Sequence, residues 1–306
     1  MKRDFLSLAD HRPEELEALL ADARRLKRER RSGHGERPLV GRTLAMIFEK
    51  PSLRTRVTFQ TGVEQLGGAA IYLAPQDIRL GARETVADIA RNLSRWVDLI
   101  VARTFSHADL VELARHATIP VINGLTDLLH PCQVLADCQT LLEHKGRLAG
   151  LKIAFIGDGN NVVNSWLHAA AAFDLEFRLA CPERYEPDSR VLERARAAAR
   201  GRIEILRDPY EAAAGADALY TDVWTSMGQE AEQQARRVAF AGYQVNAELL
   251  ARAAPDAVVM HCLPAHRGEE ITSEVLDGPA SVVLEQAENR LHAQKALMIW
   301  LTRESA

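Results

Sequence analysis

The sequence is most informative between residues 48 and 68, where Phe48-Glu49-Lys50-Pro51-Ser52-Leu53-Arg54-Thr55-Arg56 leads on to Gly67-Gly68. The apolar run at residues 43–48 is typical of a buried strand, and Pro51 turns the chain where that strand ends. Ser52 stands where a helix N-cap is expected, and the two glycines supply the helix stop. This stretch therefore predicts a strand, a tight turn and a helix in direct succession.

The first turn of this helix carries Arg54, Thr55 and Arg56, although the positive end of a helix dipole favours acidic residues. Backbone N–H groups at a helix start, together with hydroxyls and guanidinium groups, form a common kind of anion site. A solvated basic turn would also explain the arginines. Because Ser52 and Thr55 are interleaved with them and Lys50 lies nearby, we favour a turn whose cations and hydroxyls all point at one phosphate.

Composition and charge limit the class of protein. A length of 306 residues predicts about two domains, and 47% hydrophobic with 26% charged residues is typical of a globular chain. The formal net charge of −4 argues against nucleic acid as a partner. No apolar run reaches the ~18 residues of a membrane span, and the N-terminus develops no signal core. The cysteines form no Cys-x-x-Cys pair. We therefore expect a cytoplasmic protein with reduced thiols and no membrane partner.

Strands and helices alternate along the chain, which predicts parallel sheets. The expected fold class is α/β, with two doubly wound parallel-sheet domains joined by interdomain helices. We expect a first domain at residues 1–146, joined by a C-terminal helix at 285–306, and a second at 147–284. The expected strands span residues 43–48, 69–73, 97–102 and 120–122, and then 151–156, 176–180, 203–206, 218–222 and 257–260. Residues 74–83 are expected to form a polar loop, and residues 5–31 one or two helices.

Polar residues follow the predicted strands of the first domain, where ligands of parallel sheets gather. Arg103 lies at such a strand end, as does the turn at Ser52, so the topology predicts that they converge. Pro131 suits the first position of a helix, and His130 and Gln133 flank it. Since these two residues are three apart, both can face one point beyond the helix start.

The second domain carries a turn, Gly157-Asp158-Gly159-Asn160-Asn161, that is similar to a dinucleotide fingerprint. Val162 stands where the third glycine is due, so we disfavour a dinucleotide and expect the Asn161 amide to bind a polar ligand. Asp222 closes a predicted strand and suits an ammonium group, and the long polar loop after it can close over a substrate. Cys262 is a candidate nucleophile, but we favour a polar contact: His261 is adjacent and no orienting acid is visible.

Four motifs in this order resemble the aspartate/ornithine carbamoyltransferase family, and they span nearly the whole chain. They are Ser52-Leu53-Arg54-Thr55-Arg56, His130-Pro131-Cys132-Gln133, Asp222-Val223-Trp224-Thr225-Ser226-Met227-Gly228 and His261-Cys262-Leu263-Pro264. The last two motifs resemble the ornithine branch and argue against aspartate. The resemblance implies transfer of a carbamoyl group from carbamoyl phosphate to the side-chain amine of L-ornithine, which gives L-citrulline in arginine metabolism. It implies no metal and no organic cofactor.

The resemblance also implies roles for individual residues, with Arg103, His130 and Cys262 as the catalytic ones. The residues implied for carbamoyl phosphate are Ser52, Leu53, Arg54, Thr55, Arg79, Arg103, His130, Gln133, Leu263 and Arg290. Those implied for ornithine are Asn161, Asp222, Ser226, Met227 and Cys262. Leu53 departs from the family, which usually has a small hydroxyl residue there, and Arg79 stands where ornithine enzymes usually have a glutamine that reaches a neighbouring subunit. Since the family forms trimers, we expect a homotrimer or a multiple of trimers.

Three alternatives remain open. The amine substrate can be an N-acylated ornithine or putrescine. Putrescine has no carboxylate, so an enzyme for it would not need Asn161 and Asp222 to bind the amino-acid end of a substrate. The glycine turn leaves an NAD-dependent dehydrogenase as a second alternative. The third is a non-catalytic assembly or regulatory subunit, which is disfavoured by the presence of Arg54, Arg103, His130, Gln133 and Cys262.

Overall fold

The computed structural model describes residues 2–33 and 35–303. Its strands are β1 (Thr43–Phe48), β2 (Ala69–Leu73), β3 (Leu99–Arg103), β4 (Val121–Leu125), β5 (Lys152–Ile156), β6 (Glu176–Ala180), β7 (Ile203–Leu206), β8 (Ala218–Thr221) and β9 (Val258–His261). Its α-helices are α1 (Pro13–Arg31), α2 (Leu53–Gln65), α3 (Pro75–Ile78), α4 (Val86–Trp96), α5 (His107–His116), α6 (Pro131–Lys145), α7 (Asn161–Phe173), α8 (Ser189–Ala198), α9 (Pro209–Ala213), α10 (Gln233–Ala239), α11 (Ala247–Leu250), α12 (Ser273–Leu276) and α13 (Val283–Thr302). Two 3₁₀ turns, Leu8–Asp10 and Glu230–Glu232, complete the order.

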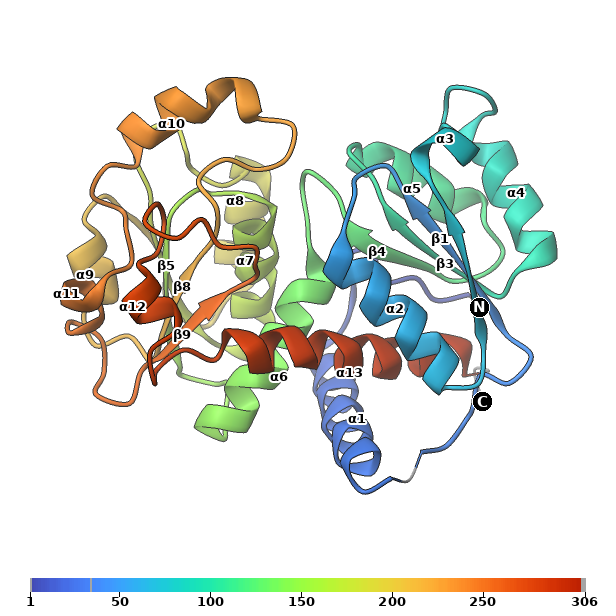
Figure 1. Cartoon of the computed structure of the whole chain (residues 1–306), viewed down its shortest axis with the longest axis horizontal. Helices are drawn as coiled ribbons and strands as arrows, with labels where there is room; N and C mark the ends of the chain where they lie inside the picture. The colour runs from blue at the N-terminus through green and yellow to red at the C-terminus, as the bar shows by residue number, and fades with distance from the viewer. Residues whose placement is uncertain (1, 34, 304–306) are drawn as a thin grey trace. The chain divides into compact units, whose positions relative to one another are not determined.

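The chain forms two compact units, each with its own parallel sheet (Figure 1). The first comprises residues 1–139 and 288–306, and the second residues 140–287. The division falls inside α6 and inside α13, so these two helices carry the chain from one unit to the other. The predicted fold class, α/β with two doubly wound parallel sheets, is confirmed.

The sheet of the first unit has the order β2-β1-β3-β4, with all strands parallel. Residues of β1 and β3 alternate between its faces, and Ala45, Ile47, Ile100 and Ala102 pack on one of them against α4 and α5. Every residue of β3 is buried, which is why its first four residues form a continuous apolar run before Arg103. Because the strand order reverses at β1, the carboxyl ends of β1 and β3 form a topological switch point, where ligands bind in such sheets.

Helix α2 packs against α13 within this unit. A Cβ added at Gly62 of α2 would lie 3.1 Å from Met298 Cε of α13, so the glycine permits this close approach. Ser52 is the N-cap of α2, as predicted, and Phe59 and Val63 on its buried face are fully inaccessible to solvent. Helix α2 is thus capped at its start by Ser52 and packed along its length against a helix from the far end of the chain.

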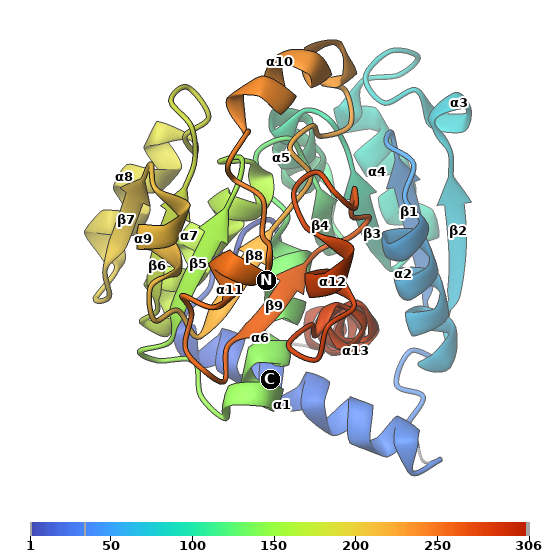
Figure 2. The same cartoon turned by 60° about the vertical axis from the view of Figure 1, so that its left-hand side comes forward.

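The sheet of the second unit has the order β7-β6-β5-β8-β9, again parallel throughout, and its strands lie side by side in Figure 2. Trp166 of α7 covers one face, with its ring centroid 5.8 Å from Tyr220 and 6.3 Å from Phe177. Phe155 stacks on Tyr220 at 5.0 Å. This aromatic layer fixes α7, and therefore the turn that precedes it, over β5 and β8.

The structure differs from the predicted elements in three places. Residues 74–83 are not all loop, because Pro75 begins the short helix α3 and the Asp77 carboxylate accepts from the N–H of Ala74. The predicted strand at 120–122 continues to Leu125. The extension was not predicted because Gly124 is an unusual residue inside a strand. The N-terminal helix begins only at Pro13.

The strand ends lie close to their predicted positions. Arg103 is the last residue of β3 and pairs in register with Phe48, the last residue of β1. Asp222 follows directly after β8, and Cys262 directly after β9. Among the described helices, none combines the length and apolar character that a membrane span requires.

The two glycines of the turn after β5 have a packing explanation. Gly157 has a φ of +143°, which L side chains rarely adopt. A Cβ added at Gly159 would lie 2.3 Å from Pro187 N and 2.6 Å from Tyr185 O, because the backbone of residues 185–187 crosses the turn there. The Gly159 N–H also donates to Tyr185 O at 2.8 Å. The space beside Gly159 is filled by protein backbone, so the glycine needs no dinucleotide to explain it.

We expect Gly159→Ala to lower the melting temperature by roughly 5 °C, since overpacking against rigid backbone costs about 2 kcal/mol. Gly35→Ala is the matched control, because nothing lies within 4 Å of a Cβ added there. Differential scanning fluorimetry of both variants provides the measurement. Equal melting temperatures would show that residues 185–187 yield to the methyl group.

Candidate active site

The first group of candidate residues lies around the N-terminus of α2. Ser52 Oγ accepts a hydrogen bond from Thr55 N at 3.2 Å. Leu53 is 74% exposed and apolar, so its backbone N–H is the donor that it can offer to a ligand at this turn. The first N–H groups of a helix have no acceptor within the helix. The positive end of the helix dipole therefore faces outward at a turn that also carries Arg54.

Arg290 joins α13, α6 and α2 at this point. Its guanidinium donates to Gln133 Oε1 and, at 3.1 Å, to Thr55 Oγ1. Gln133 Nε2 in turn donates to Asp137 Oδ1 at 2.8 Å, which fixes the orientation of the Gln133 amide. Arg290 is only 2% exposed. The structure thus brings together Thr55, Gln133 and Arg290, three residues that the sequence analysis assigned to one ligand.

Three guanidinium groups act on His130 in this first group. Burial, followed by the charges of Arg290, Arg103 and Arg54, holds the pKa of His130 well below its usual value. His130 is therefore neutral at pH 7, and one of its ring nitrogens carries a hydrogen that it can donate. The electrostatic field at His130 is positive, because these cations lie close enough to disfavour its protonation. This arrangement suits an anionic or strongly polarised ligand.

Two cations of the predicted phosphate turn have other contacts. The Arg56 guanidinium lies over the Tyr72 ring, 3.8 Å from its centroid, so Arg56 does not point with Arg54 at a common anion. Residues two apart on a helix do not face each other, which is the physical reason. Lys50 pairs with Asp127 and lies 4.3 Å from the centroid of the Phe105 ring.

Arg79 is the C-cap residue of α3, with a left-handed backbone at φ 42°, and its side chain is exposed. The structure places this residue beyond β2, the edge strand of the first sheet. No contact described for Arg79 joins it to the arginines around His130, so its assignment to carbamoyl phosphate stays a prediction.

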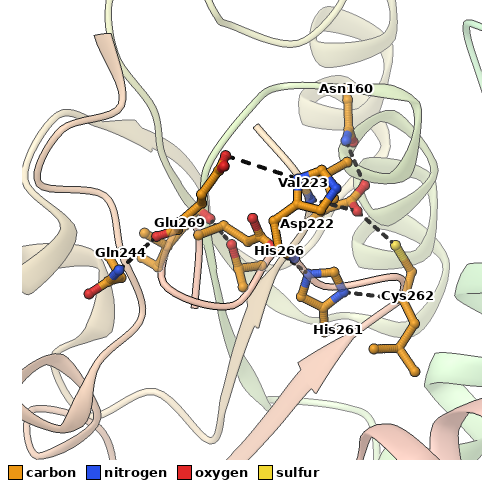
Figure 3. Close-up of polar contacts among 12 residues, drawn as sticks. Asn160, Asp222, Val223, Gln244, His261, Cys262, His266 and Glu269 are labelled. Carbon is orange, nitrogen blue, oxygen red and sulfur yellow. Dashed lines mark hydrogen bonds and ion pairs between the residues drawn. The ribbon is translucent and has the colours of Figure 1, made fainter. Parts of the chain in front are cut away.

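The second group of candidate residues surrounds Asp222, which is 7% exposed (Figure 3). Asp222 Oδ1 accepts from Cys262 Sγ at 2.9 Å and from Val223 N at 2.8 Å. Asp222 Oδ2 accepts from Asn160 Nδ2 at 2.8 Å. An acid that the sequence did not reveal thus lies beside Cys262, and the thiol donates to it. The acid stands forty positions earlier in the sequence, and the parallel pairing of β8 and β9 brings the two together.

The side chain of His261, next to Cys262 in the sequence, holds the turn after β9 through hydrogen bonds. Its Nδ1 accepts from the N–H of Leu263 at 2.8 Å, and its Nε2 lies 3.1 Å from Glu270 Oε1. Its own N–H donates to Gln286 Oε1 at 3.0 Å. These contacts hold the turn after β9, where Leu263 has a left-handed φ of 58° that is uncommon for leucine. With both ring nitrogens engaged, His261 is poorly placed to serve as a base for Cys262.

The remaining ornithine candidates occupy the turns after β5 and β8. Asn161 is the first residue of α7, and the N-cap is its neighbour Asn160, which the sequence analysis did not single out. The Ser226 N–H donates to Gln229 Oε1 at 3.2 Å, and Met227 is 46% exposed.

A buried ion pair between Asp158 and Arg236 connects these two turns, and the sequence analysis did not predict it. Arg236 of α10 donates to Asp158 Oδ2 at 3.0 Å and to the carbonyl of Trp224 at 2.9 Å. Glu232 lies on the other side of the guanidinium at 3.0 Å. Burial raises the pKa of Asp158 to about 6, although Arg236 acts in the opposite direction.

Two clusters in the second unit present donor atoms of the kind that hold metal ions. Asp222, His261 and Cys262 form one, and His266, Glu269 and Glu270 form the other, each with its donor atoms within 4.8 Å of one another. In the first cluster both ring nitrogens of His261 are already engaged, so a metal would have to displace the Leu263 N–H or Glu270. Hydrogen bonding among the residues themselves explains that cluster.

Both halves of the chain match models of one family. Residues 3–143 match the carbamoyl-P binding domain of aspartate/ornithine carbamoyltransferase, and residues 149–301 match its Asp/Orn binding domain. The chain belongs to the aspartate/ornithine carbamoyltransferase family.

Individual relatives narrow the similarity to one branch of that family. The ornithine carbamoyltransferase of Syntrophus aciditrophicus is 55% identical over 97% of this chain and 99% of its own length. The enzyme named "Ornithine carbamoyltransferase, anabolic" of Pseudomonas aeruginosa is 54% identical over 97% of this chain and 96% of its own. The solved structure of ornithine carbamoyltransferase from Pyrococcus furiosus superposes with a TM-score of 0.94 at 51% identity, and covers 97% of this chain and 96% of that one.

The raised pKa of Asp158 predicts a specific pH dependence of stability. Because the folded state binds a proton at Asp158 more tightly than the unfolded state does, the contribution of this group to stability is largest below about pH 4 and falls as pH rises to about 6. We therefore expect the melting temperature of the wild type, relative to Asp158→Asn, to fall between pH 4.5 and about pH 6.5. Calorimetry across this range provides the measurement, and a constant difference would contradict the shift.

Proposed function

We propose that the protein transfers the carbamoyl group of carbamoyl phosphate to the side-chain amine of L-ornithine, giving L-citrulline and phosphate. The observation that carries this proposal is the buried Arg290 guanidinium at the N-terminus of α2, which donates to Thr55 and Gln133 and, with Arg103 and Arg54, holds the pKa of the buried His130 well below its usual value. A dianionic phosphate ester of a small carbonyl compound fits such a positively charged site. We assign residues 1–146 with 285–306 to carbamoyl phosphate and residues 147–284 to ornithine, in keeping with the order of the two family models.

The first unit supplies the groups for the reacting carbonyl. Ser52, Leu53, Arg54 and Thr55 hold the phosphate through side chains and helix N–H groups. Arg103 and His130 donate to the carbonyl oxygen, where negative charge develops as the amine attacks. The remaining assignments for carbamoyl phosphate are Arg79, Gln133, the Leu263 carbonyl and Arg290.

The second unit supplies the groups for the amine substrate. Asp222, with Cys262 at 2.9 Å, faces an ammonium or amine and governs its proton. Asn161, Ser226 and Met227 hold the amino-acid end of ornithine in this proposal.

The reaction forms one bond and breaks another. The neutral amine nitrogen attacks the carbamoyl carbon, the bond from that carbon to the phosphate oxygen breaks, and the departing phosphate accepts the proton that the nitrogen loses. Phosphate leaves as an anion that the α2 turn already holds. Holding the two substrates in register supplies a large part of the rate enhancement in reactions of this kind. The proposal includes no metal and no organic cofactor.

The names of the relatives support ornithine as the amine and synthesis as the direction. The Syntrophus, Pseudomonas and Pyrococcus proteins are all named ornithine carbamoyltransferase, and the Pseudomonas protein is named anabolic. We therefore propose a role in arginine biosynthesis, in the cytoplasm. A dehydrogenase is disfavoured, because protein backbone fills the space beside Gly159.

A colorimetric citrulline assay tests the function directly. The enzyme is given carbamoyl phosphate with ornithine, N-acetylornithine, putrescine, lysine or aspartate in separate reactions. We expect turnover with ornithine alone. Faster turnover of N-acetylornithine or putrescine would reassign the amine, and absence of turnover with every amine would contradict the proposal.

We expect Arg54→Ala to lower kcat/KM for carbamoyl phosphate by at least about 100-fold, since a charge-assisted contact to phosphate contributes on the order of 3 kcal/mol. Arg56→Ala is the matched control, because it removes the same charge two residues away, where the guanidinium stacks on Tyr72. Its kcat/KM should change less than about threefold. Steady-state kinetics with carbamoyl phosphate varied provides the measurement, and equal losses in both variants would place the phosphate elsewhere.

We further propose a homotrimer or a multiple of trimers. Leu53 and Val57 on α2 and Ile71 on β2 are large apolar residues with exposed fractions of 74%, 49% and 47%, which is consistent with a surface that a second copy covers. We expect light scattering coupled to gel filtration to give a mass near three times 33.9 kDa or a multiple of it. A monomeric mass would contradict this part of the proposal.

A further inference from the structure

Asn160 connects three segments of the second unit through its two amide atoms. Its Oδ1 accepts from Val162 N at 2.9 Å and Val163 N at 3.2 Å, and so caps α7. Its Nδ2 donates to Asp222 Oδ2 at 2.8 Å (Figure 3). Asn160 therefore joins the turn after β5 and the start of α7 to the end of β8.

The cap decides which way the amide faces. Backbone N–H groups can only donate, so the oxygen of Asn160 must lie toward the helix and the nitrogen toward Asp222. The Asp222 oxygen that faces this nitrogen must then accept, which an ionised carboxylate does well. The Val223 N–H and the Cys262 thiol also donate to Asp222, so the three contacts described for this carboxylate all come from donors that fix its orientation.

We propose that Asn160 is a positioning residue, which holds the Asp222 carboxylate in place and oriented toward the substrate amine. This inference rests on the proposed function, since the amine is that of the second substrate. Asn160 itself need not touch the substrate. Its effect passes through Asp222, and the remaining lone pairs of that carboxylate are left for the amine.

The charged and titratable groups around Asp222 come from each neighbouring turn. Cys262, directly after β9, has its Sγ 2.9 Å from Asp222 Oδ1. Asp158, in the turn after β5, pairs with Arg236 of α10, and its charge also interacts with that of Asp222. A ring nitrogen of His261 lies within 4.8 Å of the Asp222 carboxylate, but the hydrogen bonds described for the ring go to Glu270 and to the Leu263 N–H. A change at position 160 therefore acts on a carboxylate that already has one acidic neighbour, Asp158.

The variant Asn160→Ser keeps the cap of α7 but removes the hydrogen bond to Asp222. Serine is as good an N-cap as asparagine, but it has no amide to donate to the carboxylate. We expect kcat/KM for ornithine to fall by roughly 10- to 100-fold, the range for losing a hydrogen bond to a charged group. The KM for carbamoyl phosphate should change less than about twofold, and the melting temperature less than about 2 °C. Asn160→Ala, which loses the cap as well, should show the same kinetic loss with a lower melting temperature.

Asn160→Asp supplies a readout that a purely structural role would not move. It keeps the cap but sets a second carboxylate against Asp222, and two such groups at this distance tend to share one proton. A shared proton restores a donor to Asp222. We therefore expect the kcat/KM of this variant for ornithine, relative to the wild type at the same pH, to rise as pH falls from 9 to 6. The same ratio for Asn160→Ser should stay flat.

The outcomes distinguish failure of the positioning role of Asn160 from failure of the proposed carbamoyl transfer. If the wild type makes citrulline and Asn160→Ser matches it, or if the loss falls equally on both substrates, the positioning role is wrong and the function stands. A ratio for Asn160→Asp that does not change with pH also overturns the positioning role. If the wild type makes no citrulline from any amine tested, the function fails and the inference fails with it.

Discussion

The first unit depends on burying positive charge where α2 begins. Arg290, on a helix near the end of the chain, reaches Thr55 on α2 and Gln133 on α6, and its guanidinium is almost inaccessible to solvent. Removing a charge from water is costly unless hydrogen bonds and counter-charges compensate for it. That cost favours a ligand with negative charge, and it also explains why His130 stays neutral in this environment. Cap, helix dipole and guanidinium groups thus all favour the same kind of ligand.

Local patterns made much of this predictable. The apolar run at residues 43–48, Ser52 as a cap and Pro131 as a helix start are features of neighbouring residues, and the structure contains all of them. Contacts between distant positions were not predictable in this way. The approach of Cys262 to Asp222 depends on which strands are neighbours in the sheet, and the pairing of Asp158 with Arg236 depends on where α10 lies. Arg56 is a different case, because helix geometry alone shows that it cannot face the same way as Arg54.

The turn after β5 shows why function must be argued from a site and not from a fold. Its first two glycines are those of a dinucleotide fingerprint, on the expected strand and before the expected helix. In this chain Gly159 admits the backbone of residues 185–187, and Asn160 uses the following helix start for its own side chain. The helix terminus that would hold a pyrophosphate instead orients an amide toward Asp222.

The engagement of His261 has a consequence for the chemistry of its neighbour. Thiols that react quickly with alkylating agents and peroxides are those ionised by an adjacent imidazolium or another cation. Cys262 instead gives its hydrogen to a carboxylate, while the imidazole beside it is occupied by Leu263 and Glu270. A partly buried cysteine in a reactive-looking sequence is thereby kept as an ordinary thiol, although it is the most accessible of the four cysteines.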